Sequence, residues 1–179
     1  MQTVERAVSE ALILAAADTE KPDIFLIAKR HGFFTGETLL LDRTDAFLVS
    51  NTGAGIRYMA FEAHPKSKVI FTSQSLEPSR KKYLTAYLLG LYLLAEDKED
   101  FFCDYKHDTA DDPKGALAAE LLLFPDKTLL SSLEETKQKL GIIDLASREA
   151  QYRLAEHYSE QLGVPSILVL RKLDRLLES

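Results

Sequence analysis

The sequence contains a single cysteine, Cys103, among its 179 residues. One thiol excludes an internal disulfide and any zinc site that needs several cysteines, and it fits a reducing compartment. Long apolar runs are also missing, since the longest nearly uncharged stretch, residues 83–95, is shorter than the ~20 residues that cross a bilayer. The N-terminus lacks a basic start followed by an apolar segment, so no secretory signal is expected. These absences predict a cytoplasmic protein without a membrane partner.

Basic residues are in deficit, because 22 Lys and Arg stand against 28 Asp and Glu, giving a net charge of −6. Contacts to phosphates supply most of the affinity for nucleic acids, so direct nucleic-acid binding is not expected. The glycine pair Gly53 and Gly55 is not followed by the Lys-Ser/Thr of a phosphate-binding loop. No Gly-x-Ser-x-Gly nucleophile motif occurs either. The sequence therefore offers no sign of these two enzyme classes.

Hydrophobic residues make up 46% of the chain, which is enough for one compact domain with at most a small appendage. Apolar spacing of three and four residues predicts helices over residues 4–17, 23–31, 80–96, 116–123, 128–140, 144–162 and 166–177. Short apolar runs between turn residues predict strands at residues 37–42, 46–50, 56–61 and 68–72. The acidic segment 97–113 is expected to be a loop.

Together these elements predict an α+β fold in which a small, mainly antiparallel sheet packs on a buried central helix. The central helix is residues 80–96, which are apolar on nearly every side. We expect an α+β core over residues 1–127 and a helical C-terminal region over residues 128–179, packed on the core as one unit.

Two segments, residues 80–94 and 117–125, resemble in composition and separation the ImmA/IrrE family of zinc metallo-endopeptidases. Ala86 and Gly90 match the family pattern Ala-His-Glu-x-Gly-His, and Tyr83 stands where the family usually has phenylalanine. Residues 154–173 are similar to the closing helix-turn-helix-like segment of the family. The resemblance extends over residues 22–173 and implies a zincin-like fold.

The positions that carry the chemistry of this family hold other residues here. Tyr87 and Leu91 stand at the two histidine positions, Leu88 at the catalytic glutamate, and Pro113 at the third ligand. In a zincin the two histidines at i and i+4 bind zinc and the glutamate polarises the attacking water. Leucine has no donor atom, and tyrosine must ionise before it can bind a metal. The resemblance therefore implies a pseudoenzyme of a metallopeptidase family, with no cofactor.

An alternative is an active zinc metallo-endopeptidase with unorthodox ligands. Its donors would come from Tyr87, Asp104, His107 and Asp112, and Cys103 lies four residues before His107, a spacing that would join the two if the segment were helical. The other interpretation of this acidic segment is a solvated loop without a metal.

Members of the ImmA/IrrE family are commonly bacterial or phage proteins encoded near a repressor that they cleave or inactivate. The resemblance thus implies protein binding and transcription regulation, with a phage or mobile-element repressor or an active protease relative as the partner. A third possibility is a structural module that only self-associates. The sequence does not indicate an oligomeric state.

Overall fold

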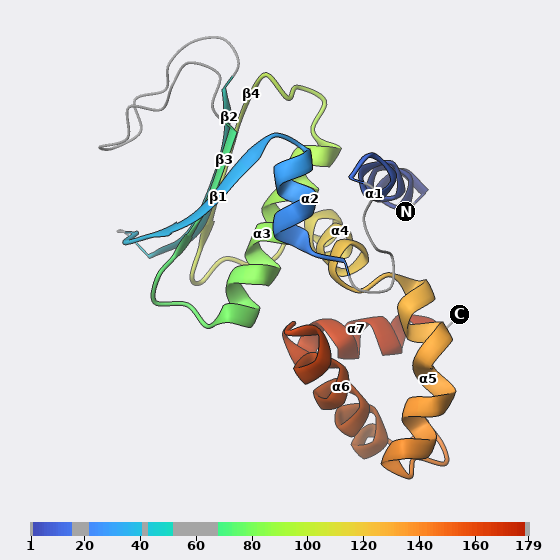
Figure 1. The fold of residues 1–179 in the computed structure, drawn as a ribbon. Helices are drawn as coiled ribbons and strands as arrows, with labels where there is room; N and C mark the ends of the chain where they lie inside the picture. The colour runs from blue at the N-terminus through green and yellow to red at the C-terminus, as the bar shows by residue number, and fades with distance from the viewer. Residues whose placement is uncertain (1, 16–21, 41–42, 52–67, 178–179) are drawn as a thin grey trace.

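The computed structural model describes residues 2–15, 22–40, 43–51 and 68–177. Within these residues the chain forms a four-stranded mixed sheet and the helices α1 to α7, which confirms the α+β class. The helices lie on one side of the sheet, with α5, α6 and α7 grouped furthest from it (Figure 1). No helix among the described residues has the length and apolar character of a membrane span.

The sheet has the order β1-β3-β2-β4, with bounds β1 (Phe33–Thr38), β2 (Thr44–Asn51), β3 (Lys68–Ser73) and β4 (Asp100–Lys106). Strand β1 pairs parallel to β3, whereas β2 pairs antiparallel to both β3 and β4. The mainly antiparallel sheet that the sequence predicts is therefore confirmed. The strand expected at residues 56–61 lies outside the described residues.

The interpretation of residues 97–113 as a loop is wrong, because residues 100–106 form the edge strand β4. Phe101, Cys103 and Tyr105 point toward the covered side, and the exposed residues between them include Asp104. The burial therefore alternates with a period of two, and the open face of the strand carries Asp100, Asp104 and Lys106 besides Phe102. Charges on an edge strand hinder pairing with other chains.

Helix α3 (Pro78–Leu94) crosses one face of the sheet and contacts β2, β3 and β4 (Figure 1). Proline at its first position is already set for helical φ, and the residues from Tyr83 to Gly90 are all buried. The prediction of a buried central helix is confirmed, with its start two residues earlier than expected.

Helix α4 (Pro113–Leu123) lies against α3, and the two approach closely at Gly90. A Cβ atom on Gly90 would lie 2.6 Å from the Cβ of Ala118, so only glycine fits there. Helix α2 (Ile24–Arg30) contacts β1 and α3, and helix α1 (Gln2–Leu14) packs on α4 and α3. The structure thus packs α4 between α3 and α1.

Helices α5 (Asp126–Leu140), α6 (Arg148–Leu162) and α7 (Ser166–Leu177) follow as the sequence predicts. Gly141 and Gly163 end α5 and α6 with φ of +65° and +61°, the left-handed conformation that favours glycine. Tyr158 of α6 packs on Phe124, with 5.2 Å between ring centroids, and so joins these helices to the end of α4. The boundary that the sequence predicts between the core and the C-terminal region, at residues 127 and 128, falls in the first turn of α5. The separation into these two regions stays a prediction.

Candidate functional site

Two of the positions matched to zinc ligands, Tyr87 and Leu91, meet the first turn of α4. Tyr87 and Leu91 lie one helical turn apart on α3, and a Cβ on Gly115 would lie 2.8 Å from Tyr87 Cε2 and 2.9 Å from Leu91 Cδ2. Gly115 is two residues after Pro113, the position matched to the third ligand. Leu88 is completely buried. The structure therefore brings Tyr87, Leu91 and the start of α4 together, with carbon atoms filling the space between them.

Tyr87 has a polar partner at this contact. Its hydroxyl accepts a hydrogen bond from the backbone N–H of Asp112 at 2.9 Å, and its ring meets the edge of Tyr105 at 5.3 Å between centroids. Burial raises the pKa of Tyr87, although the hydrogen bond from Asp112 acts in the opposite direction. The phenol is therefore neutral at ordinary pH.

The carboxylate of Asp112 caps α4. Its Oδ1 accepts from the backbone N–H groups of Lys114 and Gly115, both at 3.0 Å. Aspartate at this position satisfies the free N–H groups at the start of a helix. Asp112, one of the donors of the alternative zinc site, is thus engaged in holding α4.

The other two donors, Asp104 and His107, lie at β4. Asp104 is on the exposed face of the strand, and His107 Nδ1 lies 3.3 Å from a carboxylate oxygen of Asp45. Because residues 100–106 are a strand, the helical spacing that would join Cys103 to His107 is absent. Burial, followed by the nearby Asp104, raises the pKa of Cys103 to about 12. The described part of the chain contains no group of three or more His, Cys, Asp or Glu placed to hold a metal.

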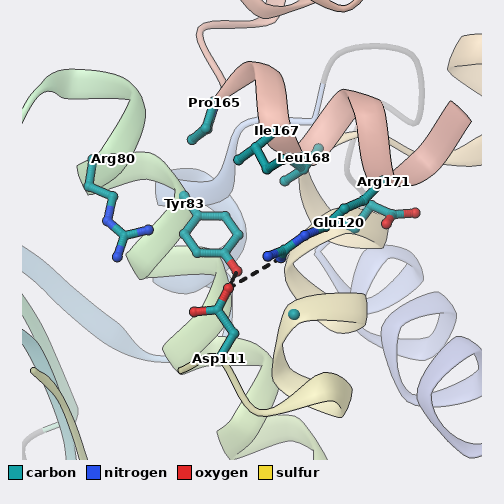
Figure 2. Close-up of a pocket in the computed structure, with 9 residues that line it drawn as sticks. Arg80, Tyr83, Asp111, Glu120, Pro165, Ile167, Leu168 and Arg171 are labelled. Atoms are coloured by element: carbon teal, nitrogen blue, oxygen red, sulfur yellow. Dashed lines mark hydrogen bonds and ion pairs between the residues drawn. The ribbon is translucent and has the colours of Figure 1, made fainter. Parts of the chain in front are cut away.

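Asp111 is a functional candidate that the sequence analysis did not single out. Its carboxylate accepts a hydrogen bond from the hydroxyl of Tyr83 at 2.7 Å and pairs with Arg171 at 3.3 Å (Figure 2). It also accepts a hydrogen bond from the hydroxyl of Tyr105 at 2.8 Å. Asp111 therefore links α3, β4 and α7. These partners are up to 60 residues away in the chain, so no local pattern could reveal them.

These contacts change the acidity of the groups involved. Burial disfavours ionisation of Asp111, but the bonds from Tyr83, Tyr105 and Arg171 outweigh it and lower the pKa of Asp111. Burial and then the bond to Asp111 raise the pKa of Tyr83. The result is an ionised carboxylate held by two neutral phenols and one guanidinium.

A second polar cluster lies where α7 meets α4 and α5. Lys172 is completely buried, and its ammonium pairs with Asp126 at 2.5 Å and Glu120 at 3.7 Å and donates to the carbonyl of Phe124. Arg175 pairs with Glu120 at 2.5 Å and with Asp126 at 3.0 Å. Burial lowers the pKa of Lys172 and raises that of Glu120, and each partner's charge opposes the shift. Two cations and two carboxylates therefore fix α7 to the rest of the protein.

Comparison with family models, with curated proteins and with solved structures finds no match to this chain. The resemblance to the ImmA/IrrE family accordingly depends on the residue pattern of α3 and α4.

Proposed function

We propose that this protein is a non-catalytic relative of the ImmA/IrrE peptidases that acts in the cytoplasm by binding a protein partner. The observation that carries the proposal is the packing of Tyr87 and Leu91 on Gly115, at the positions where the family holds zinc. The partner that the resemblance implies is a repressor of a phage or mobile element. Binding without cleavage would regulate transcription through that repressor.

The chemistry of metal binding supports the loss of catalysis. A zinc site needs three or four converging donor atoms, and structural sites contribute roughly 10 kcal/mol or more. Leu88 and Leu91 offer no donor, and the neutral hydroxyl of Tyr87 is already bonded to the Asp112 backbone. Apolar filling also avoids a buried, unpaired carboxylate or imidazolium, which would cost several kcal/mol.

The charges of α7 favour a protein partner over a nucleic acid. Arg171, Lys172 and Arg175 all pair with carboxylates of this chain, on Asp111, Glu120 and Asp126. A helix that reads DNA needs its cations free to contact phosphates and base edges. Here all three of these cations are paired within the protein.

Metal content and partner integrity test the proposal together. The protein is purified without chelator, incubated with zinc, desalted and analysed by plasma mass spectrometry, with Tyr87→Phe as the matched variant. It is then mixed with a purified repressor of a phage or mobile element, and the complex is measured by light scattering and intact mass. We expect substoichiometric zinc in both forms and a complex containing the full-length repressor.

One zinc ion per chain that is lost in the Tyr87→Phe variant, together with chelator-sensitive cleavage of the repressor, would establish the alternative of an active zinc metallo-endopeptidase. Self-association that is unchanged by the repressor would instead favour a structural module and contradict the proposal.

A further inference from the structure

Strand β1 lies at one edge of the sheet, and its outer side has no paired strand among the described residues (Figure 1). The carbonyl of Thr38 accepts a hydrogen bond from the backbone N–H of Gln74, which follows β3, at 3.0 Å. Backbone groups of successive residues in a strand alternate between its two sides. The N–H and C=O groups of Phe33, Thr35 and Glu37 therefore point outward and are available to another strand.

The two edges of the sheet differ in charge. The exposed face of β4 carries Asp100, Asp104 and Lys106, and charges of this kind hinder the pairing of edge strands. Strand β1 contains no lysine or proline, and its one charged residue, Glu37, is paired with Lys81 of α3 at 2.7 Å. The β1 edge therefore lacks the features by which edge strands avoid other chains.

The β1 edge also presents apolar surface. The side chain of Phe34 is 63% exposed, and its ring centroid lies 5.9 Å from that of Phe71 on β3. A Cβ on Gly36 would lie 2.7 Å from Phe71 Cε1 and 3.1 Å from Phe34 Cε1, so glycine allows both rings to lie over the strand. Leu39, just after the strand, is exposed as well. Burial of this surface against another chain would favour association.

Strand β1 is complementary to a second copy of itself in antiparallel orientation. With Thr35 at the two-fold axis, Thr35 faces its own copy and Phe33 faces Glu37 of the other copy, so the outward backbone groups bond in opposing pairs. The two Glu37 carboxylates are not opposite each other, and each keeps its pair with Lys81. The two Phe34 residues become diagonal neighbours about 7–8 Å apart, within reach of an aromatic contact.

We propose that two copies of this chain pair through β1, antiparallel about Thr35, and join their sheets into one continuous sheet. Pairing of β1 with β4 of another copy is disfavoured, because β4 carries unlike and like charges at its edge and such contacts would propagate without closing. The dimer is independent of the proposed function, because it involves neither Tyr87 nor Leu91.

Sedimentation equilibrium of the protein alone, without a repressor, tests the proposal. We expect a reversible monomer–dimer equilibrium. Phe34→Lys places two ammonium groups beside the two-fold axis and should weaken the dimer at least about tenfold. Leu130→Lys, at a similarly exposed leucine on α5 (61%), is the matched control and should leave the dimer unchanged. Circular dichroism verifies that both variants are folded. A monomer at every concentration up to about 1 mM, or equal dimerisation of the two variants, would overturn the proposal.

Cross-linking tests the register of the pair. In a Cys103→Ser background, Thr35→Cys would place two thiols on residues whose Cα atoms lie about 5.5 Å apart, within the range of a disulfide. Mild oxidation should give a linked dimer from this variant and none from Lys106→Cys at the β4 edge. Linkage through residue 106 in place of residue 35 would contradict the proposal. A dimer that binds no repressor would contradict the proposed function alone, and a monomer that binds one would contradict this inference alone.

Discussion

Helix α4 contacts α3 through carbon and α7 through charge. Toward α3 the contact consists of Gly90 against Ala118 and of Gly115 against Tyr87 and Leu91. Toward α7 it consists of the buried ion pairs that Glu120 makes with Lys172 and Arg175. The contact between α4 and α3 depends on close packing, so added volume should destabilise it. The contact between α4 and α7 depends on complete ion pairing, so removal of one charge should destabilise it.

This difference bears on function. The proposed relationship to the ImmA/IrrE family would place zinc at the contact between α3 and α4, and apolar groups fill that contact. Ion pairs instead join α7 to α4 and α5. The cations of these pairs are therefore engaged within the protein.

The largest effect is expected from Lys172→Met, which breaks the charged contact. The substitution leaves the buried Glu120 and the partly exposed Asp126 with Arg175 alone. Because a buried carboxylate then lacks full compensation, we expect a loss of about 3–5 kcal/mol in the free energy of unfolding. Urea titration followed by circular dichroism measures it. Lys127→Met, at an exposed lysine on α5, is the control and should change stability by less than about 0.5 kcal/mol. Equal stabilities of the two variants would show that the buried pairs contribute nothing.

Adding one methyl group should break the apolar contact. Gly90→Ala brings a Cβ to 2.6 Å from Ala118 Cβ, and we expect a loss of about 1–3 kcal/mol even though alanine favours helices. The double variant with Ala118→Gly exchanges the methyl group between the helices and should recover most of the loss. A double variant less stable than Gly90→Ala would contradict this account of the contact.

Tyr87→Phe removes the hydroxyl that accepts a hydrogen bond from the backbone N–H of Asp112 at the start of α4. The backbone N–H of Asp112 would lose its acceptor, and we expect a loss of about 1 kcal/mol. Tyr152→Phe, at a half-exposed tyrosine of α6, provides the comparison and should be neutral in the same urea titration. A neutral Tyr87→Phe would mean that water or another acceptor replaces the hydroxyl.

The smallest effect is a pH dependence assigned to Asp111. Its pKa is lower in the folded protein than the value of about 3.9 for an unfolded chain, so its ionised form stabilises the fold. That contribution is present above the unfolded pKa and disappears as the pH falls through the lower folded pKa. The stability difference between the protein and Asp111→Asn should therefore shrink as the pH drops below about 4. A difference that stays constant down to acid unfolding would refute the assignment.

The sequence predicts the helices well because their apolar faces repeat every three to four residues. Helix α7, residues 166–177, has the predicted bounds, and the predicted central helix is displaced by only two residues at each end. Strand β4 was missed because its exposed positions carry Asp100 and Asp104, and acidic residues next to a proline suggested a loop. An edge strand combines one apolar face with one charged face, and the charged face of β4 hides the apolar alternation in the sequence.

The polar contacts could not be predicted from the sequence. Asp111 meets Tyr83 and Arg171 only after α3 and α7 have packed, at separations of 28 and 60 residues. Lysine is rarely buried unless it is paired, and the partners of Lys172, Glu120 and Asp126, belong to other helices. Local periodicity reports which face is apolar, but it does not report which charges meet across two helices.

The central claim is that carbon and one neutral hydroxyl fill the space where the proposed relationship to the ImmA/IrrE peptidases would place zinc. A crystal grown with zinc and measured on both sides of the zinc absorption edge tests it most directly. We expect no anomalous peak between Tyr87, Leu91 and Gly115, with the tyrosine hydroxyl still bonded to the Asp112 backbone. An ordered zinc ion within bonding distance of the Tyr87 hydroxyl would contradict the claim.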